Sequence, residues 1–324
     1  MITLVTGATG LVGNNVVRLL LEQGRAVRVL ARESSDPRPL EGLDVETVRG
    51  DVCDVESVIR AADGVGRVIH AAAMVHVGWT GLDQQRAVNV EGTRNVCAAA
   101  DEFGARMVHV SSVDALGPGT IENPGDEDSP SGSGVPCPYV ITKGEAEQVV
   151  LQHVGQGLDA VIVNPAFMLG PWDWKPSSGR MLLAVAKHRP WIAPAGGNDF
   201  CDVRDVAAGI ITALDRGQTG RRYILGGEPL SYFEAFTMLA DVAGRKGPVR
   251  VGRRPLMKLS GVAGDLWGKI TGHEGDLNSA AIEIAMMPHH YSYARAAAEL
   301  DYHPRPVREA AEAAWEWFLE HRYA

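Results

Sequence analysis

Cysteine is scarce in this chain of 324 residues, and aromatic residues make up only 6% of it. The four cysteines are far apart and show no C-x-x-C or metal-ligand spacing: Cys53, Cys97, Cys137 and Cys201. This pattern argues against a disulfide scaffold and predicts reduced thiols in a cytoplasmic protein. His289 and His290 are adjacent but have no third ligand nearby in the sequence, so we expect no metal site.

Long apolar runs are missing too. No stretch approaches the roughly 20 residues that a helix needs to cross a bilayer. The chain starts with an apolar strand pattern and without a basic leader, so we expect no signal peptide. Acidic residues outnumber basic ones by 40 to 31, which gives a net charge of −9. This balance argues against nucleic acid or an anionic membrane as the main partner and leaves a small-molecule substrate.

Short apolar segments alternate with helical patterns over the first 165 residues. The expected strands are Ile2–Thr6, Ala26–Ala31, Val45–Arg49, Arg67–His70, Met107–Ser111 and Ala160–Asn164, and the expected helices are Leu11–Gln23, Val55–Ala61, Leu82–Phe103 and Tyr139–His153. Short strands rich in Val and Ile, without strict alternation, are typical of a parallel sheet covered on both faces. The pattern predicts an α/β fold with a Rossmann-type doubly wound sheet, whose ligand lies beyond the carboxyl ends of the strands.

The character of the sequence changes after Pro165. Residues 1–165 are predicted to form the nucleotide-binding domain, to which residues 203–226 return as a helix near Asp205–Leu214 and a strand at Arg222–Leu225. Residues 166–202 are irregular and rich in Trp and Pro, and residues 227–324 are mostly helical. These two segments are predicted to form a smaller C-terminal lobe for the substrate.

A glycine-rich turn follows the first expected strand and opens the first expected helix. Its glycines are Gly7, Gly10 and Gly13, and the intervening residues Thr9, Leu11 and Val12 complete the candidate phosphate-binding turn. In such a turn the first glycine allows the tight bend, the second admits a pyrophosphate and the third allows close helix–strand packing. The free N–H groups at the helix N-terminus attract phosphate. The position of the motif therefore predicts a dinucleotide site.

The end of the second strand should select between NAD and NADP. An acid there binds the ribose 2′-hydroxyl, whereas an Arg accommodates a 2′-phosphate. Here Arg32 follows Ala31, which favours NADP(H), while Glu33 keeps NAD(H) possible. Asp51, after the third strand, can accept a hydrogen bond from an adenine amino group, or it caps the loop.

Tyr139 and Lys143 stand four residues apart and so share one face of a helix. A phenol with a pKa near 10 is a poor acid or base at neutral pH. A neighbouring ammonium and a cationic nicotinamide are expected to lower that pKa, so that Tyr139 exchanges a proton with a substrate oxygen. Ser112, after the fifth strand, is positioned to hydrogen-bond the same oxygen.

Several motifs together resemble the extended short-chain dehydrogenase/reductase family. They are Thr6–Gly13, Gly50-Asp51, His70-Ala71-Ala72, Asn89–Thr93, Ser111-Ser112, Tyr139–Lys143 and the closing segment Ser292–Pro304. Within the family, Asn164–Pro171 is most similar to the dihydroflavonol-4-reductase branch, which also includes hopanoid-associated epimerase-like proteins and, more distantly, 3β-hydroxysteroid dehydrogenases.

The resemblance implies catalytic roles for Ser112, Tyr139 and Lys143, with Lys143 also holding the nicotinamide ribose. The further cofactor contacts that it implies are Val52, Ala71, Ala72, Ala73, Ser111, Pro165, Ala166 and Phe167. It also implies a homodimer built on the helices Leu82–Phe103 and Tyr139–His153. The small apolar residues expected to face the partner are Ala87, Val88, Cys97, Ala98 and Ala99.

Two activities stay open at this stage. Nucleotide-sugar enzymes of the family often carry Arg-Asp-Phe where this chain has Asn198-Asp199-Phe200, which favours a reductase or dehydrogenase. Sugar dehydratases carry an acid two residues after the catalytic Ser or Thr, and Asp114 occupies that position, although it could simply cap its loop. An epimerase or dehydratase with retained cofactor therefore remains the alternative.

Aromatic side chains with few fixed cations suit a partly apolar carbonyl compound. The candidate substrate contacts, besides Asp114, are His76, Trp79, Met168 and Trp172. Packing within the C-terminal lobe is the alternative role for each Trp.

Overall fold

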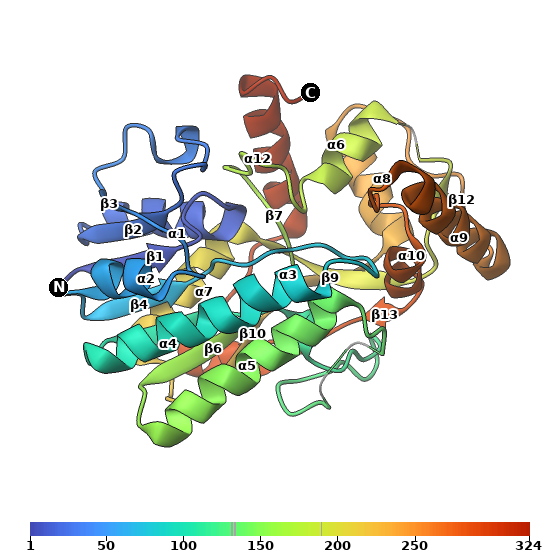
Figure 1. Cartoon of the computed structure of the whole chain (residues 1–324). Coiled ribbons are helices and arrows are strands. Elements are labelled where there is room, and N and C mark those ends of the chain that lie inside the picture. Colours follow the sequence, from blue (N-terminus) through green and yellow to red (C-terminus); the bar gives the residue numbers. More distant parts are fainter. Residues whose placement is uncertain (131, 133, 189) are drawn as a thin grey trace.

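The computed structural model describes residues 1–130, 132, 134–188 and 190–324. Its main feature is a sheet of seven parallel strands (Figure 1). These are β1 (Thr3–Thr6), β2 (Val27–Ala31), β3 (Glu46–Arg49), β4 (Arg67–His70), β5 (Arg106–Val110), β6 (Ala160–Pro165) and β10 (Arg222–Leu225). They are arranged in the order β10-β6-β5-β4-β1-β2-β3. The order reverses at β1, and the expected Rossmann-type fold is confirmed.

Helices cover both faces of the sheet. They are α1 (Leu11–Glu22), α2 (Val55–Ala62), α4 (Gly92–Glu102), α5 (Pro138–Gln156) and α7 (Val203–Arg216). One apolar core joins α1 and α7 to the sheet, and a second joins α2, α4 and α5 to its other face. Both faces of the central strands are therefore buried, which agrees with their content of Val, Ile and Leu, whereas the edge strand β3 is largely exposed.

The expected helix over Leu82–Phe103 is present, but it contains a π-helical insertion. A short α3 (Leu82–Gln85) leads into a π-helical stretch, Arg86–Glu91, before α4 begins. The Asn89 amide lies in the π-helical stretch and bonds both backbone groups of Met74, at 2.7 and 3.0 Å. A π-bulge of this kind re-aims a side chain, often at a functional site.

The C-terminal lobe contains a small sheet as well as helices. The strands β7 (Phe167–Leu169), β9 (Gly197–Asp202), β11 (Glu228–Ser231) and β13 (Pro288–His289) form this sheet, and β8 (Ile192–Ala193) pairs with β12 (Arg250–Val251). The helices are α6 (Arg180–Lys187), α8 (Tyr232–Val242), α9 (Arg254–Thr271), α10 (Ser279–Ala285), α11 (Ala294–Leu300) and α12 (Val307–Glu320). Within the described ranges, none of the helices has the length and apolar character required to cross a membrane.

Two residues assigned to a dimer surface lie in the interior instead. Cys97 is fully buried and Ala99 nearly so, both in the core between α4 and the sheet. The prediction that they face a partner is therefore wrong. Ala87 and Ala98 are exposed and Val88 is half-buried, so the outer face of this region carries only part of the expected apolar set.

Candidate active site

The glycine turn has the geometry of a phosphate cradle. Gly7 has a φ of +73°, and a Cβ there would lie 2.6 Å from the backbone of Ala71 and Ala72, so only glycine fits. A Cβ on Gly13 would collide with the Gly7 carbonyl. Gly10, which caps α1, is exposed, and its Cβ position meets only the Gly7 carbonyl, at 3.4 Å. The turn thus leaves room for a ligand at Gly10 and at the N-terminus of α1.

The other residues of the turn differ in how far they are buried. Leu11 is buried, while Thr9 and Val12 are half-buried. At the end of β5, the Ser111 hydroxyl is buried and has no hydrogen-bond partner among the described residues. An unpaired buried hydroxyl is uncommon, and a bound dinucleotide would supply its partner. These observations fit a dinucleotide, the group implied by the motif.

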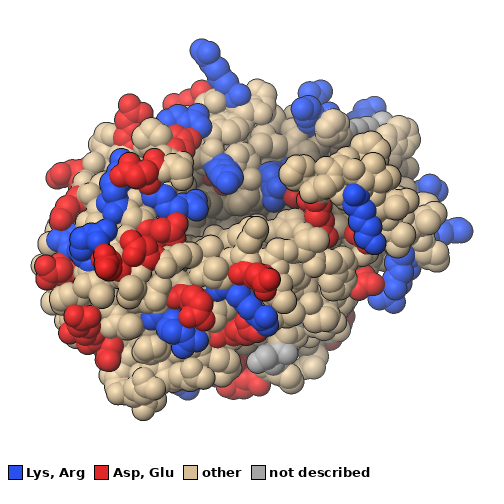
Figure 2. Space-filling view, viewed as in Figure 1, with Lys and Arg blue, Asp and Glu red and all other residues tan. Residues whose placement is uncertain are grey.

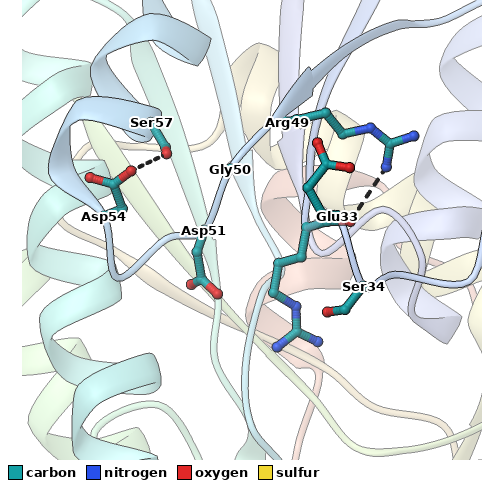
Figure 3. A pocket seen from close by; sticks show the side chains of 8 residues that line it. Glu33, Ser34, Arg49, Gly50, Asp51, Asp54 and Ser57 are labelled. Carbon is teal, nitrogen blue, oxygen red and sulfur yellow. Dashed lines mark hydrogen bonds between the residues drawn. The ribbon is translucent and has the colours of Figure 1, made fainter.

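A hollow of about 380 Å³ lies beyond the ends of β2 and β3. Its lining residues are Arg32, Glu33, Ser34, Arg49, Gly50, Asp51, Asp54 and Ser57. Figure 3 shows Glu33 and Arg49 side by side at its upper edge, with Ser34 and Asp51 reaching the lower part. Arg49 was not predicted from the sequence. Its Nη1 lies 3.4 Å from the Arg32 carbonyl, which places a second guanidinium at this hollow.

Asp51 and Val52 shape the loop after β3. Asp51 Oδ1 accepts a hydrogen bond from the Cys53 amide at 3.0 Å, so the loop-capping role considered above is present. The Val52 side chain is buried against α4, where a Cβ on Gly92 would lie 2.9 Å from Val52 Cγ2. The Asn95 amide binds the Val52 carbonyl at 2.9 Å. These contacts hold the edge of the hollow.

Ser112, Tyr139 and Lys143 meet at the carboxyl end of β5. Ser112 caps a 3₁₀ turn, Val113–Ala115, and Tyr139 and Lys143 lie in the first turns of α5. All three are buried, and the Ser112 hydroxyl is near enough to the Tyr139 phenol to lower its pKa. Asp114 joins them, because its Oδ2 lies 3.0 Å from Ser112 Oγ. The structure therefore brings the three predicted catalytic residues and the alternative acid into one cluster.

The surroundings of Tyr139 within the protein raise the pKa of its phenol. Burial raises its pKa above 10, the charge of Asp114 raises it further, and the Ser112 hydroxyl only partly opposes them. The lowering expected from Lys143 together with a cationic nicotinamide concerns the enzyme with its cofactor, and it stays a prediction. The Lys143 ammonium donates to the Val110 carbonyl at 3.1 Å.

Lys143 belongs to a buried network that the sequence analysis missed. Burial lowers the pKa of its ammonium to about 8, against opposing effects of Glu147 and Asp114. Glu147 is itself buried and accepts from Asn164 at 2.6 Å and from Arg222 at 2.7 Å. Asn164 also donates to the Ser112 carbonyl at 2.9 Å. The signal for Glu147 was its position four residues after Lys143, on the same helix face.

The two substrate candidates in the loop after β4 contact the C-terminal lobe. His76 Nε2 lies 3.0 Å from Glu274 Oε2, and the Trp79 indole donates to Ser279 Oγ at 2.7 Å. Glu274 also accepts from the Trp79 amide and from both donors of Thr80, at 2.6 to 3.0 Å. These residues therefore tie the loop to the α9–α10 connection.

The residues after β6 run from the sheet into the lobe. The Ala166 amide donates to Leu225 at 3.1 Å, and the Phe167 ring packs on Phe200 with centroids 5.0 Å apart. Met168 is half-buried in β7 beside Phe167. Trp172 stacks under the Arg18 guanidinium at 3.3 Å and adjoins Trp317 in an aromatic cluster, which is the packing role allowed above.

Figure 2 shows this face of the molecule hollowed between the sheet and the lobe. The fold and the buried Ser–Tyr–Lys cluster define a nucleotide-binding α/β protein of the short-chain dehydrogenase/reductase type. Residues 3–226 match the model of the NAD-dependent epimerase/dehydratase family. The chain belongs to this family, whose members are extended short-chain dehydrogenases/reductases, and it is an enzyme of that superfamily.

Proteins similar to this chain carry several different names. The chain is 40% identical to sterol demethylase protein B of Methylococcus capsulatus over 76% of each chain. It is 34% identical to a putative dihydroflavonol 4-reductase of Synechocystis over 98% of its own length and 95% of the relative's. A solved structure, gox2253, superposes with a TM-score of 0.87 at 35% identity, covering 99% of this chain and 98% of the other.

Proposed function

We propose that this enzyme is an NAD(P)-dependent oxidoreductase that interconverts a ketone or aldehyde and the corresponding alcohol of a small, partly apolar substrate. The observation that carries the proposal is the buried cluster in which the Ser112 hydroxyl lies near the Tyr139 phenol, one helical turn from Lys143. The names of the relatives support it, since they include a 3β-hydroxysteroid dehydrogenase of Mycolicibacterium neoaurum, 31% identical over 96% of this chain and 89% of the relative.

Tyr139, Ser112 and Lys143 have different roles in the proposed reaction. In the reduction direction, the Tyr139 hydroxyl donates its proton to the carbonyl oxygen, and the Ser112 hydroxyl donates a hydrogen bond to the same atom. When bound, a reduced nicotinamide supplies the hydride that reaches the carbonyl carbon. The Lys143 ammonium holds the cofactor's ribose and, together with the charge of the oxidised ring, offsets the burial and the Asp114 charge that raise the phenol pKa.

The hollow at β2 and β3 supports NADP(H) as the favoured cofactor. Arg32 and Arg49 bring two guanidinium groups to it and Ser34 brings a hydroxyl, all suited to a 2′-phosphate. Glu33 is the one feature that favours the unphosphorylated ribose. Figure 3 shows Glu33 beside Arg49 on the rim of the hollow.

An epimerase or dehydratase remains the second candidate, because the Asp114 carboxylate lies 3.0 Å from Ser112 Oγ and therefore inside the cluster. The deciding experiment incubates the purified protein with NADPH or NADH and a panel of apolar ketones and aldehydes, and separately with nucleotide sugars. We expect carbonyl-dependent loss of the reduced-nicotinamide absorbance and a protein that purifies without cofactor. A tightly retained cofactor, with turnover of nucleotide sugars and no net change in absorbance, would establish the second candidate instead.

A further inference from the structure

We propose that α9 docks the enzyme onto the surface of an anionic lipid membrane. The helix lies in the plane of the surface and does not cross it. This inference goes beyond the proposed redox function and does not depend on it. It also revises the expectation that no membrane takes part, because that expectation used the charge of the whole chain and not of this segment.

The first observation is that α9 buries its small residues and exposes its large apolar ones, which is the reverse of a normal surface helix. Of its 18 residues, the buried ones are Gly261 and Gly268. A Cβ on Gly261 would lie 2.8 Å from Ser279 Cα, and one on Gly264 would overlap the Leu277 carbonyl. The glycine face therefore packs closely on the segment that leads into α10, and the large side chains are left on the outer face.

The outer face is a continuous apolar stripe. Leu259, Leu266 and Ile270 are spaced by seven and four residues, which places them on one side of a helix. Their exposed fractions are 65%, 59% and 70%. Leu256, Val262 and Trp267 extend the stripe and are at least half exposed as well. Soluble proteins rarely leave a contiguous patch of this kind uncovered.

The second observation is the charge around the stripe. Residues 245–271 contain seven Lys or Arg and a single acid, Asp265, so this segment carries +6 in a chain of −9. Asp265 is turned inward and accepts from the Ser279 amide at 2.9 Å. At the right of Figure 2, where α9 protrudes in Figure 1, blue groups border the tan surface. Lys258 and Lys269 are exposed beside the stripe, and Lys258 Nζ lies 4.0 Å from Glu283 Oε1 on the neighbouring α10.

The positive charge around the stripe favours an anionic membrane over a second copy of the chain as its partner. A symmetric dimer through α9 would bring two equally positive surfaces together, because both copies contribute the same patch. An anionic headgroup layer instead complements the basic border, and its acyl boundary accepts the apolar stripe. The α9–α10 connection is in turn held by the loop of His76 and Trp79, which contacts Glu274 and Ser279.

The test is flotation of the full chain with vesicles of phosphatidylcholine alone and of phosphatidylcholine mixed with phosphatidylglycerol. We expect binding to the mixed vesicles only, weakened when salt is raised from ~0.1 M to ~1 M because screening shortens the Debye length. The triple variant L259S/L266S/I270S and the pair K258E/K269E should each reduce the bound fraction about tenfold or more. Wild-type protein that does not float with the mixed vesicles would overturn the proposal.

A matched control separates the stripe from general hydrophobicity. V55S/I121S/L319S removes three scattered side chains that are 46% to 57% exposed, and it should bind like wild type. The Trp267 emission should shift to the blue with mixed vesicles, and the W267F variant should lose that shift. If the stripe variant floats as well as wild type, or if it only converts a dimer to a monomer in light scattering, the face contacts something other than lipid and the proposal is wrong.

Discussion

At the scale of single residues, the site is built by side chains that are buried and yet paired. Lys143 is held by the Val110 carbonyl, and Glu147 is shared between Asn164 and Arg222. Burying an ammonium lowers its pKa, and the nearby carboxylates keep that of Lys143 at about 8. The ammonium therefore stays largely charged at neutral pH, as its proposed role requires.

Tyr139→Phe tests the proton donor. The change keeps the ring and its packing but removes the exchangeable proton, so turnover should fall by roughly two to four orders of magnitude while NADPH binding stays nearly unchanged. Steady-state kinetics and cofactor titration measure the two quantities. Tyr302→Phe is the control, because it removes another buried hydroxyl, bonded to the Gly226 carbonyl, outside the site. Turnover near the parent rate in Tyr139→Phe would disprove the mechanism and make Asp114 the leading candidate.

Arg32→Ala tests the cofactor preference. Only NADP(H) offers a 2′-phosphate to this guanidinium. The affinity of the enzyme for NADP(H) should therefore fall by about tenfold or more, and its affinity for NAD(H) should change little. Fluorescence titration with both reduced cofactors gives the two dissociation constants. Arg94→Ala, an exposed Arg on α4 that pairs with Glu91, serves as the control. Equal losses for the two cofactors would contradict the assignment.

At the scale of elements, Glu274 joins two parts of the molecule that are distant in sequence. Burial raises the pKa of its carboxyl, but hydrogen bonds from Thr80, Trp79 and His76 outweigh burial and lower it to about 2. A carboxyl whose folded pKa is depressed stabilises the fold above its unfolded pKa, near 4.5, and loses that effect as the pH falls toward 2.

Glu274→Gln should therefore lower the free energy of unfolding by about 1–3 kcal/mol at neutral pH, since it replaces a charged acceptor of several hydrogen bonds. Urea unfolding at pH 7 and below pH 4 measures the difference from wild type, which should shrink in acid. Asp276→Asn is the matched control, because its ion pair with Arg180 is largely exposed and should contribute little. A difference that does not change with pH would rule out the charge as the cause.

At the scale of the whole molecule, we propose that the enzyme forms a homodimer through the outer faces of α4 and α5. Exposed Ala98 on α4 supports this, although Cys97 and Ala99 face inward. Light scattering should give twice the chain mass at micromolar concentration, and Ala98→Arg should shift the protein to monomer. The stripe variant of α9 should remain dimeric. A wild-type monomer at that concentration would contradict the proposal.

The sequence by itself determined the Rossmann-type sheet and the glycine turn, and it pointed to Ser112, Tyr139 and Lys143 as the proposed catalytic residues. These features depend on local pattern, such as apolar strands, a turn that only glycine can adopt, and a four-residue helical spacing. The tertiary structure decided what depends on neighbours brought together from far along the chain. Burial raised the pKa of Tyr139, Asn89 adopted a π-helical turn to reach Met74, and Cys97 faced the core. The outward stripe of α9 also belongs here, because periodicity predicts one apolar face but only packing shows which face touches the protein.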